Sequence, residues 1–249
     1  MEPRTAQDKA KHAAGRTVVT DHVRNGTTLG LGSGTTSHWF VRALGDAVAE
    51  GLDIVGVPTS SGTRQLARQL DIPLADLDEA GDLDLAVDGA DEIDHDGAMI
   101  KGGGACLLWE RIVANAAART IVVVDDSKLV DVLGSYPLPI EVIPFGWQTT
   151  QRAVQRLLHD AGYPQPRLSR RESRKGRPVE TDSGNYVLDA RLGHIHDKKW
   201  LDKALNWVPG VVENGLFTGI ADTCVLAHPD GATEVRDLPR TTPAREIPR

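Results

Sequence analysis

LGLGSGTTS (29–37) joins a short apolar segment to a glycine-rich turn and then to a helix-like segment that continues to Ala49. The same alternation returns downstream, because DIVGV (53–57) and LDLAVDG (83–89) are each followed by a helix-like stretch, and IVVVDD (121–126) continues the series. Buried strands that alternate with helices are typical of a doubly wound, mostly parallel sheet, so we predict a Rossmann-like α/β domain. Ligands bind such sheets at the carboxyl ends of the strands, where the glycine and acidic clusters of this chain fall.

A different pattern begins after Leu133. Pro-flanked or alternating strands are expected over 137–145, 185–192 and 211–217, and helices over 148–161 and 197–208. This order predicts a smaller α+β, ferredoxin-like domain on an antiparallel sheet. The expected domains are residues 1–133 plus 218–249 for the Rossmann-like catalytic domain and 134–217 for the small domain.

Three further segments complete the predicted fold. Residues 221–228 (ADTCVLAH) are expected as a strand that returns to the first domain. The basic segment 167–180 lacks apolar periodicity, so we interpret it as a solvated loop or hairpin rather than a polyanion contact. The tail from Pro229 is rich in Pro and Arg and is expected to fray.

The composition limits the class of protein. A formal net charge of -7 and a pI near 5.6 argue against a nucleic-acid-binding protein, which usually has a basic face. Cys106 and Cys224 lie far apart, and no Cys/His spacing suggests zinc, so neither a disulfide framework nor a metal centre is expected. No leader and no apolar run near the ~20 residues that span a bilayer are visible, so we expect a cytoplasmic protein without membrane contact.

The glycine-rich turn is the first candidate binding site. Glycines let the backbone approach a ligand closely, and free N–H groups at a helix start, together with hydroxyls, can hold a phosphate. The spacing is not GxGxxG, because Thr35 stands at the third glycine position, and no GK[ST] follows as in a nucleotide P-loop. A tight turn without a ligand is the alternative interpretation. The candidate residues are Gly32, Ser33, Gly34, Thr35 and Thr36.

AVDGADEID (86–94) places several carboxylates just beyond a strand. Such a cluster can bind a metal, coordinate hydroxyls, or raise the pKa of one carboxyl until it acts as an acid near neutral pH. Asp88 directly ends the strand and is the candidate, whereas Glu92 and Asp94 are interpreted as a solvated acidic turn. Lys101 follows closely and can supply positive charge instead of a metal.

IKGGGACLLWERIVA (100–114) carries the most information. Successive glycines indicate backbone with positive φ or backbone against a ligand, and their N–H groups can polarise a carbonyl as an oxyanion hole. Glu110 follows among apolar helix residues, where burial raises a carboxyl pKa toward that of a general base; an ordinary acid in the first helical turn is the alternative. Cys106 is interpreted as a small buried thiol. Lys128, after the strand 121–126, is either a charge on a phosphate or a solvated residue.

Taken together, seven stretches resemble the ribose-5-phosphate isomerase A family. They occur in family order and cover nearly all of residues 27–226, and the combination of DGADE, KGGG and PLPIEV is highly specific. The resemblance implies a cofactor-free and metal-free aldose-ketose isomerase that interconverts D-ribose 5-phosphate and D-ribulose 5-phosphate through an enediolate, in the non-oxidative pentose phosphate pathway. The stretches are GLGSGTTS (30–37), GVPTSSGTRQLA (56–67), DLDLAVDGADEID (82–94), IKGGGACLLWERIVA (100–114), DDSKLVDVLGSYPLPIEVIPF (125–145), TDSGNYVLD (181–189) and PGVVENGLF (209–217).

The resemblance also implies roles by position. Glu110 is the base that takes the proton from C2 and returns it to C1. Asp88 and Lys101 open the ring and shuttle protons between substrate oxygens, with Asp91 beside them, and the N–H groups of the three glycines stabilise the oxyanion. The residues implied to hold the substrate are Gly32, Ser33, Gly34, Thr35, Thr36, Gly89, Gly102, Gly103, Gly104 and Lys128.

The chain departs from the family pattern near these residues. Its loop reads GSGTT where the family usually has GTGST, which redistributes the hydroxyls. Trp109 stands where arginine or a polar residue is common, and Arg111 where lysine is common. In the family a lysine near the N-terminus contacts the phosphate, and here Lys9 and Lys11 are both candidates.

Other interpretations of the same fold remain. An amino-sugar phosphate deaminase-isomerase, or a CoA transferase with a glutamate nucleophile, shares the fold, but the spacing from KGGG to Glu110 with DGADE upstream favours the isomerase. A sugar-phosphate-sensing domain of a transcription regulator needs a DNA-binding head, and a sheet that begins by Thr27 leaves no room for one. The expected partners are a small-molecule sugar phosphate and further copies of the chain, as a homodimer or homotetramer, with no nucleic acid and no membrane.

Overall fold

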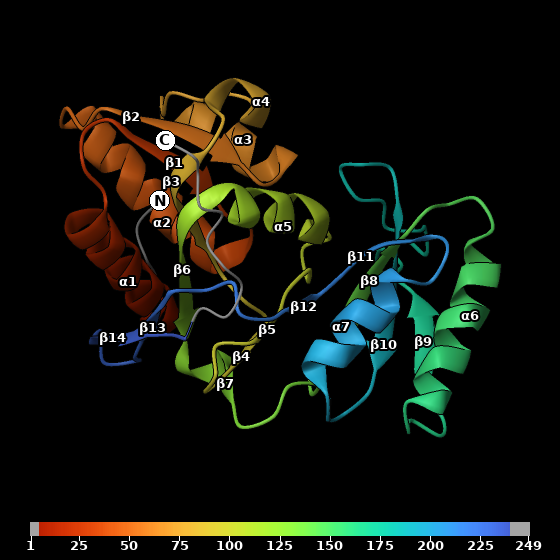
Figure 1. Cartoon of the computed structure of the whole chain (residues 1–249). Coiled ribbons are helices and arrows are strands. Elements are labelled where there is room, and N and C mark those ends of the chain that lie inside the picture. Colours follow the sequence, from red (N-terminus) through yellow and green to blue (C-terminus); the bar gives the residue numbers. More distant parts are fainter. Residues whose placement is uncertain (1–4, 240–249) are drawn as a thin grey trace. The chain divides into compact units, whose positions relative to one another are not determined.

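The computed structural model describes residues 5–239. The chain divides into two compact units, whose elements are labelled in Figure 1. Within the described residues, the first unit comprises 5–90, 109–129 and 219–239, and the second comprises 91–108 and 130–218. The domain boundaries expected from the sequence stay a prediction. The division into compact units differs from them chiefly in placing residues 91–108 in the second unit.

The first unit is built on a six-stranded sheet with the order β14-β13-β6-β3-β1-β2. Neighbouring strands are parallel from β13 to β2, and only the edge strand β14 is antiparallel to its neighbour. The predicted doubly wound, mostly parallel sheet is therefore confirmed. The strands are β1 (Thr27–Leu31), β2 (Ile54–Pro58), β3 (Leu83–Asp88), β6 (Ala117–Asp125), β13 (Thr223–Ala227) and β14 (Thr233–Asp237).

Helices cover both faces of this sheet. Residues of α1 (Ala6–His22), α2 (Gly34–Ala49) and α3 (Ser61–Gln69) share one apolar cluster with Val87 of β3. Residues of α4 (Leu77–Ala80) and α5 (Leu107–Ala116) share another cluster with Ala86. Because successive side chains of a strand point to opposite faces, these two clusters lie on opposite sides of the sheet.

The second unit contains a four-stranded antiparallel sheet with the order β11-β8-β10-β9. In chain order its elements alternate as strand, helix, strand, strand, helix, strand, which is the split βαβ arrangement of ferredoxin-like domains, as predicted. Ile140, Leu188 and Leu205 belong to its apolar core. The elements are β8 (Leu138–Val142), α6 (Trp147–Asp160), β9 (Arg167–Arg170), β10 (Tyr186–Arg191), α7 (Lys198–Asn206) and β11 (Val211–Asn214).

The expected single strand over 211–217 is wrong, because the chain changes sheets at Gly215. β11 pairs with β8, whereas β12 (Leu216–Phe217) pairs with β5 (Met99–Ile100). A Cβ on Gly215 would lie 2.7 Å from Cδ of Pro139, so only glycine permits this crossing. β12 belongs to a third sheet, with the order β12-β5-β4-β7, which also contains β4 (Glu92–Asp94) and β7 (Leu129–Val130).

Two terminal segments also differ from expectation. The tail from Pro229 does not simply fray, since residues 233–237 form β14 and pair with β13; residues 240–249 lie outside the described part of the chain. The helix α1 was not predicted from the sequence. Its start carries a capping box, in which Thr5 Oγ1 accepts the N–H of Asp8 at 3.0 Å and the Asp8 carboxylate accepts the N–H of Thr5.

Candidate active site

The glycine-rich loop connects the end of β1 to the start of α2. Gly34 is the first residue of α2 and has a φ of +86°, which a side chain would strain. The helix N-cap is Ser33, whose Oγ lies 2.6 Å from Oγ1 of Thr59 instead of bonding to the helix. The first amides of α2 therefore point out of the helix end as donors, with the exposed Thr35 in the first turn. Such an end attracts anions.

A lysine from α1 reaches this loop. Lys11 Nζ lies 3.4 Å from Thr35 Oγ1 and 3.3 Å from Asp125 Oδ2, and the residue is only 7% exposed. Burial opposes ionisation of Asp125, but hydrogen bonds from Ser127 and the charge of Lys11 outweigh it and lower the pKa of this carboxyl. Lys9 is exposed. Of the two lysines left open by the sequence, Lys11 is thus the one beside the loop.

Asp88 ends β3 and is tied to the same loop. Its Oδ1 accepts hydrogen bonds from Ser33 N at 2.9 Å, Ser37 Oγ at 3.0 Å and Gly89 N at 2.8 Å. Three donors on one oxygen hold the carboxylate in one orientation. Gly32 makes the approach possible, because a Cβ there would lie 2.5 Å from Asp88 Cα.

Gly32→Ala should therefore destabilise the protein by about 2–3 kcal/mol and lower Tm by roughly 5–10 °C, because backbone rather than a flexible side chain blocks the new methyl group. Thermal unfolding followed by circular dichroism measures this change. Gly62→Ala is the matched control, since Gly62 is an exposed residue of α3 with no tight neighbour, and alanine there should leave Tm unchanged or raise it slightly. Equal Tm values for the two variants would contradict the assigned role of Gly32.

The candidate base lies in the first turn of α5. Glu110 is 5% exposed, and Leu107 and Val113 on the same helix are buried, so the partly buried setting expected from the sequence is present. Lys128 lies in a short 3-10 segment (Asp126–Lys128) directly after β6 and is half-buried.

In the second unit, the glycine turn is held by Asp91. Asp91 Oδ2 accepts the N–H of Gly103 at 2.7 Å. A Cβ on Gly103 would lie 2.5 Å from Asp91 Oδ1 and 2.6 Å from the hydroxyl of Tyr136, so a side chain here would have to displace these two groups. The position of Gly102 favours glycine for its conformation, with a φ of +99°. Gly104 is exposed. Because its N–H already binds Asp91, Gly103 is not available in this structure as an oxyanion donor, in contrast to the sequence-based expectation.

The same turn is anchored from the other side by Arg171. Its Nη1 donates to the carbonyl oxygens of Gly102 and Gly103, both at 2.9 Å. Its Nε and Nη2 pair with the carboxylate of Asp189, at 2.9 and 2.5 Å. A trans peptide directs its N–H opposite to its C=O, so fixing the carbonyl of Gly103 also fixes the direction of the N–H of Gly104. Arg171 lies in the segment interpreted as solvated, and for this residue that interpretation is wrong.

Lys101 follows β5 directly and is 5% exposed. Its N–H donates to the carbonyl of Gly215 at 2.9 Å, and its Nζ lies 5.5 Å from the centroid of the Phe217 ring. A lysine over an aromatic face gains a favourable electrostatic contact. The change of sheet at Gly215 therefore brings two groups to Lys101: the carbonyl of Gly215 and the ring of Phe217.

Comparisons with known proteins place these residues in a family. The sequence model described as "Ribose 5-phosphate isomerase A (phosphoriboisomerase A)" matches residues 55–231. A protein of Yersinia pseudotuberculosis named "Ribose-5-phosphate isomerase A 2" is 49% identical over 92% of this chain and 98% of its own length. The chain belongs to the ribose-5-phosphate isomerase A family.

Solved structures agree. Ribose 5-phosphate isomerase A of Methanocaldococcus jannaschii is 37% identical, with a TM-score of 0.85 over 93% of this chain and 99% of that one. A D-ribose-5-phosphate isomerase in complex with phospho-erythronic acid has the same identity and TM-score, over 92% of this chain and 98% of that one. These relatives favour an isomerase over the deaminase and CoA-transferase alternatives. Of the helices within residues 5–239, none has both the length and the apolar character needed to cross a membrane.

In this ribose-5-phosphate isomerase A family member, the burial of Glu92, Asp94 and Cys106 differs from the burial predicted from the sequence. Glu92 and Asp94 are not a solvated turn, since they are 4% and 6% exposed. Glu92 accepts the N–H groups of Gly134 and Tyr136 at 2.7 and 2.5 Å, and Asp94 forms an ion pair with Lys198. Their carboxylates therefore order loops within the second unit. Cys106 is half-buried rather than buried, with its Sγ 3.2 Å from the carbonyl of Gly104.

Sequence reasoning missed residues that support the site rather than form it. These side chains contact the predicted residues only through the tertiary fold, and three of them, Ser37, Thr59 and Tyr136, carry no motif of their own. Ser37, Thr59 and Tyr136 do stand in stretches that resemble the family (30–37, 56–67 and 125–145), which was the available signal. The missed supporting residues are Ser37, Thr59, Tyr136 and Arg171.

A buried carboxyl also contacts the start of α5. Glu141 on β8 is fully buried, and its Oε1 accepts hydrogen bonds from Thr181 at 2.8 Å and Asn185 at 2.9 Å. The backbone amide of Leu108 is a further hydrogen-bond partner. Glu213 is its cross-strand partner on β11. Burial raises the pKa of Glu141, and the charge of Glu213 raises it further, against the hydrogen bonds that lower it.

This raised pKa predicts a pH dependence of stability. A carboxyl whose pKa is higher in the folded state than in the unfolded state stabilises the protein at pH values below 4.5, its ordinary pKa. This stabilisation is lost as the pH rises through the folded-state pKa. Glu141→Gln removes the titration. The free energy of unfolding of the variant minus that of the wild type should therefore increase between pH 4.5 and pH 8. The increase should be about 1.4 kcal/mol for each unit by which the Glu141 pKa is raised. Urea unfolding at several pH values measures the difference.

The control for this series is Glu180→Gln, because Glu180 is an exposed carboxylate of the same unit. The difference in free energy of unfolding between Glu180→Gln and the wild type should not change across the pH range. A difference for Glu141→Gln that is equally flat would mean that the carboxyl titrates normally in the folded protein.

Proposed function

We propose that this chain interconverts D-ribose 5-phosphate and D-ribulose 5-phosphate, the reaction after which its family is named. The observation that carries the proposal is Glu110, a buried carboxylate in the first helical turn after the glycine turn, in a chain whose relatives are ribose-5-phosphate isomerases. A buried carboxylate is suited to act as general base in a proton transfer next to a carbonyl.

In the proposed reaction, Glu110 removes the proton from C2 of the open-chain aldose. The electron pair forms the C1–C2 double bond, and the C1 carbonyl oxygen becomes an oxyanion, which gives an enediolate. A proton passes from O2 to O1, the C2 carbonyl forms, and Glu110 returns its proton to C1. The reaction is balanced without a redox cofactor or a metal ion.

The oxyanion needs donors aimed at it. Gly102 and Gly104 can supply backbone N–H groups, while the N–H of Gly103 is held by Asp91. Arg171 supports this role because it fixes the carbonyls of the turn. We propose that Asp88 and Lys101 open the furanose ring and carry protons between the substrate oxygens.

We propose that the phosphate end is bound by the start of α2. Its uncapped amides, the hydroxyls of Ser33, Thr35 and Thr36, and the ammonium of Lys11 offer donors and positive charge, with Lys128 as a further cation. A relative with a TM-score of 0.85 was solved in complex with phospho-erythronic acid, a phosphorylated sugar acid, which supports a sugar-phosphate ligand.

A coupled assay of the EDTA-treated protein with ribose 5-phosphate, following ribulose 5-phosphate, tests the function. We expect turnover without added metal. No turnover with ribose 5-phosphate, together with turnover of another sugar phosphate such as glucosamine 6-phosphate, would reject the proposed substrate.

We further propose a cytoplasmic homodimer or homotetramer. The two cysteines are free thiols, which agrees with a reducing compartment. Phe145 and Trp207 on the second unit are 89% and 87% exposed, and large exposed apolar side chains are common at subunit contacts. Light scattering after size-exclusion chromatography would reject this proposal if it gave the mass of one chain.

A further inference from the structure

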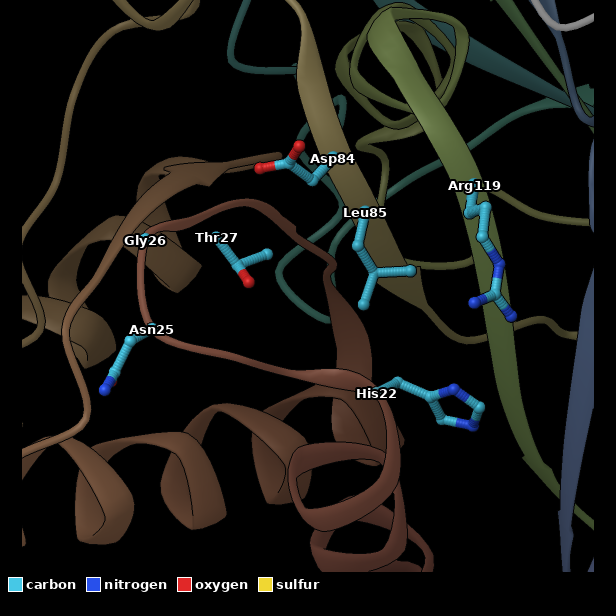
Figure 2. A pocket seen from close by; sticks show the side chains of 7 residues that line it. All are labelled: His22, Asn25, Gly26, Thr27, Asp84, Leu85 and Arg119. Carbon is cyan, nitrogen blue, oxygen red and sulfur yellow. The ribbon is translucent and has the colours of Figure 1, made fainter.

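A cavity of about 320 Å³ lies within the first unit, away from the residues discussed so far (Figure 2). It is lined by residues at the end of α1, at the start of β1 and near the starts of β3 and β6. These strands are parallel, so the cavity lies at the amino-terminal edge of the sheet, roughly 15–20 Å from the edge that carries Asp88. Its lining residues include His22, Asn25, Thr27, Asp84, Leu85 and Arg119.

One end of this cavity is formed by two nitrogen-rich side chains. Figure 2 shows the guanidinium of Arg119 beside the ring of His22. Within residues 5–239, the Nε2 atom of His22 is buried and has no hydrogen-bond partner. Arg119 is exposed, donates one long hydrogen bond of 3.4 Å to Thr223 Oγ1, and forms no ion pair in that part of the chain. The Arg119 guanidinium therefore has donors without an anionic partner among the described residues, and the unpaired Nε2 of His22 becomes a further donor when the ring is protonated.

The electrostatics of this end follow from its neighbours. Burial lowers the pKa of His22 and the charge of Arg119 lowers it further, while Asp21 acts in the opposite direction and Arg24 adds a smaller lowering effect. Asp84 lies at the other end of the cavity, across Leu85 (Figure 2). The Asp84 carboxylate accepts two hydrogen bonds, from Thr28 N at 2.8 Å and Thr28 Oγ1 at 2.9 Å, and both are on Oδ2. One oxygen of Asp84 is therefore occupied by hydrogen bonds from Thr28, and the carboxylate forms no ion pair with Arg119 within residues 5–239.

We propose that this cavity is a binding site for a small oxyanion, held by Arg119 and His22. A guanidinium presents paired donors to a carboxylate, phosphate or sulfate group, and His22 Nε2 adds a charged donor when the ring is protonated. The rest of the ligand lies over Leu85, where a hydroxyl or ammonium group can donate to Asp84. The site is distinct from the proposed isomerase site and does not depend on it.

The proposal has a measurable consequence for His22. An anion that binds beside the ring favours the imidazolium, and by reciprocity protonated His22 favours the anion. Sulfate is the first probe, because its charge is constant between pH 6 and 8; acetate is the second and represents a carboxylate. The readout is the NMR signal of the His22 ring, assigned by its loss in His22→Gln. We expect sulfate to bind at least about threefold more tightly at pH 6 than at pH 8, as judged from this signal.

Arg119→Gln is the test variant, because Arg119 is exposed and its replacement should not affect folding. It should weaken binding at the His22 signal at least about tenfold for whichever probe binds, while isomerase activity stays unchanged. The relative affinities of sulfate and acetate distinguish a phosphate-like ligand from a carboxylate. A His22 signal that responds to neither probe, or that responds equally in wild type and Arg119→Gln, would overturn the proposal.

Discussion

Glu110→Gln should lower kcat for ribose 5-phosphate by about 10²–10⁴-fold, because the amide keeps the shape of the side chain but cannot accept the proton from C2. KM should change little, since the substrate is proposed to be held by other groups, chiefly the loop before α2. The coupled assay measures both constants. In D₂O, the variant should also lose the exchange of solvent deuterium into the C1 or C2 position that an enediolate intermediate allows.

Glu79→Gln is the matched control, because Glu79 is an exposed glutamate of the same unit. Its kcat should equal that of the wild type. Circular dichroism and Tm establish that both variants are folded. If Glu110→Gln kept kcat within about threefold of the wild type, another group would have to be the base, and the proposed mechanism would be wrong.

Arg171→Gln should lower kcat by about 10–100-fold, although this residue is not proposed to contact the substrate. Its guanidinium holds the carbonyls of Gly102 and Gly103, and through the planar peptide it directs the N–H of Gly104. Loss of one oxyanion donor typically costs 10²–10³-fold in kcat, and a donor that is only misdirected should cost less. The variant also leaves Asp189 without its main partner, which should destabilise the protein by about 2–4 kcal/mol.

The split between kinetic constants separates positioning from general loss of structure. Measured well below its Tm, Arg171→Gln should show a lower kcat with KM within about threefold of the wild type. Arg171→Lys should restore little of the activity, because an ammonium cannot bind two carbonyls and a carboxylate with the geometry of a guanidinium. Arg174→Gln, an exposed arginine of the same basic segment, should behave as the wild type. A normal kcat in Arg171→Gln would remove Arg171 from the mechanism.

The order of the main elements could be predicted from the sequence because their signals are local. Alternating apolar strands and helices determined the parallel sheet, and the glycines at 30–34 marked the turn between β1 and α2. Pro and Gly positions likewise marked most of the second unit. The motif-bearing residues Asp88, Lys101 and Glu110 were found in the same way, since each follows a recognisable strand or turn.

The contacts that orient these residues were decided by the tertiary structure alone. Ser37 reaches Asp88 across 51 positions of the chain, and Arg171 reaches the carbonyl of Gly102 across 69. No local pattern distinguishes Arg171 from Arg167, Arg174 and Arg177, which are exposed arginines of the same segment. Glu92 and Asp94 were interpreted from the sequence as a solvated turn for the same reason. The amides and the lysine that bind their carboxylates come from distant segments. Local sequence determines backbone preference and periodicity, whereas the partner of a polar side chain depends on which distant segments the fold brings together.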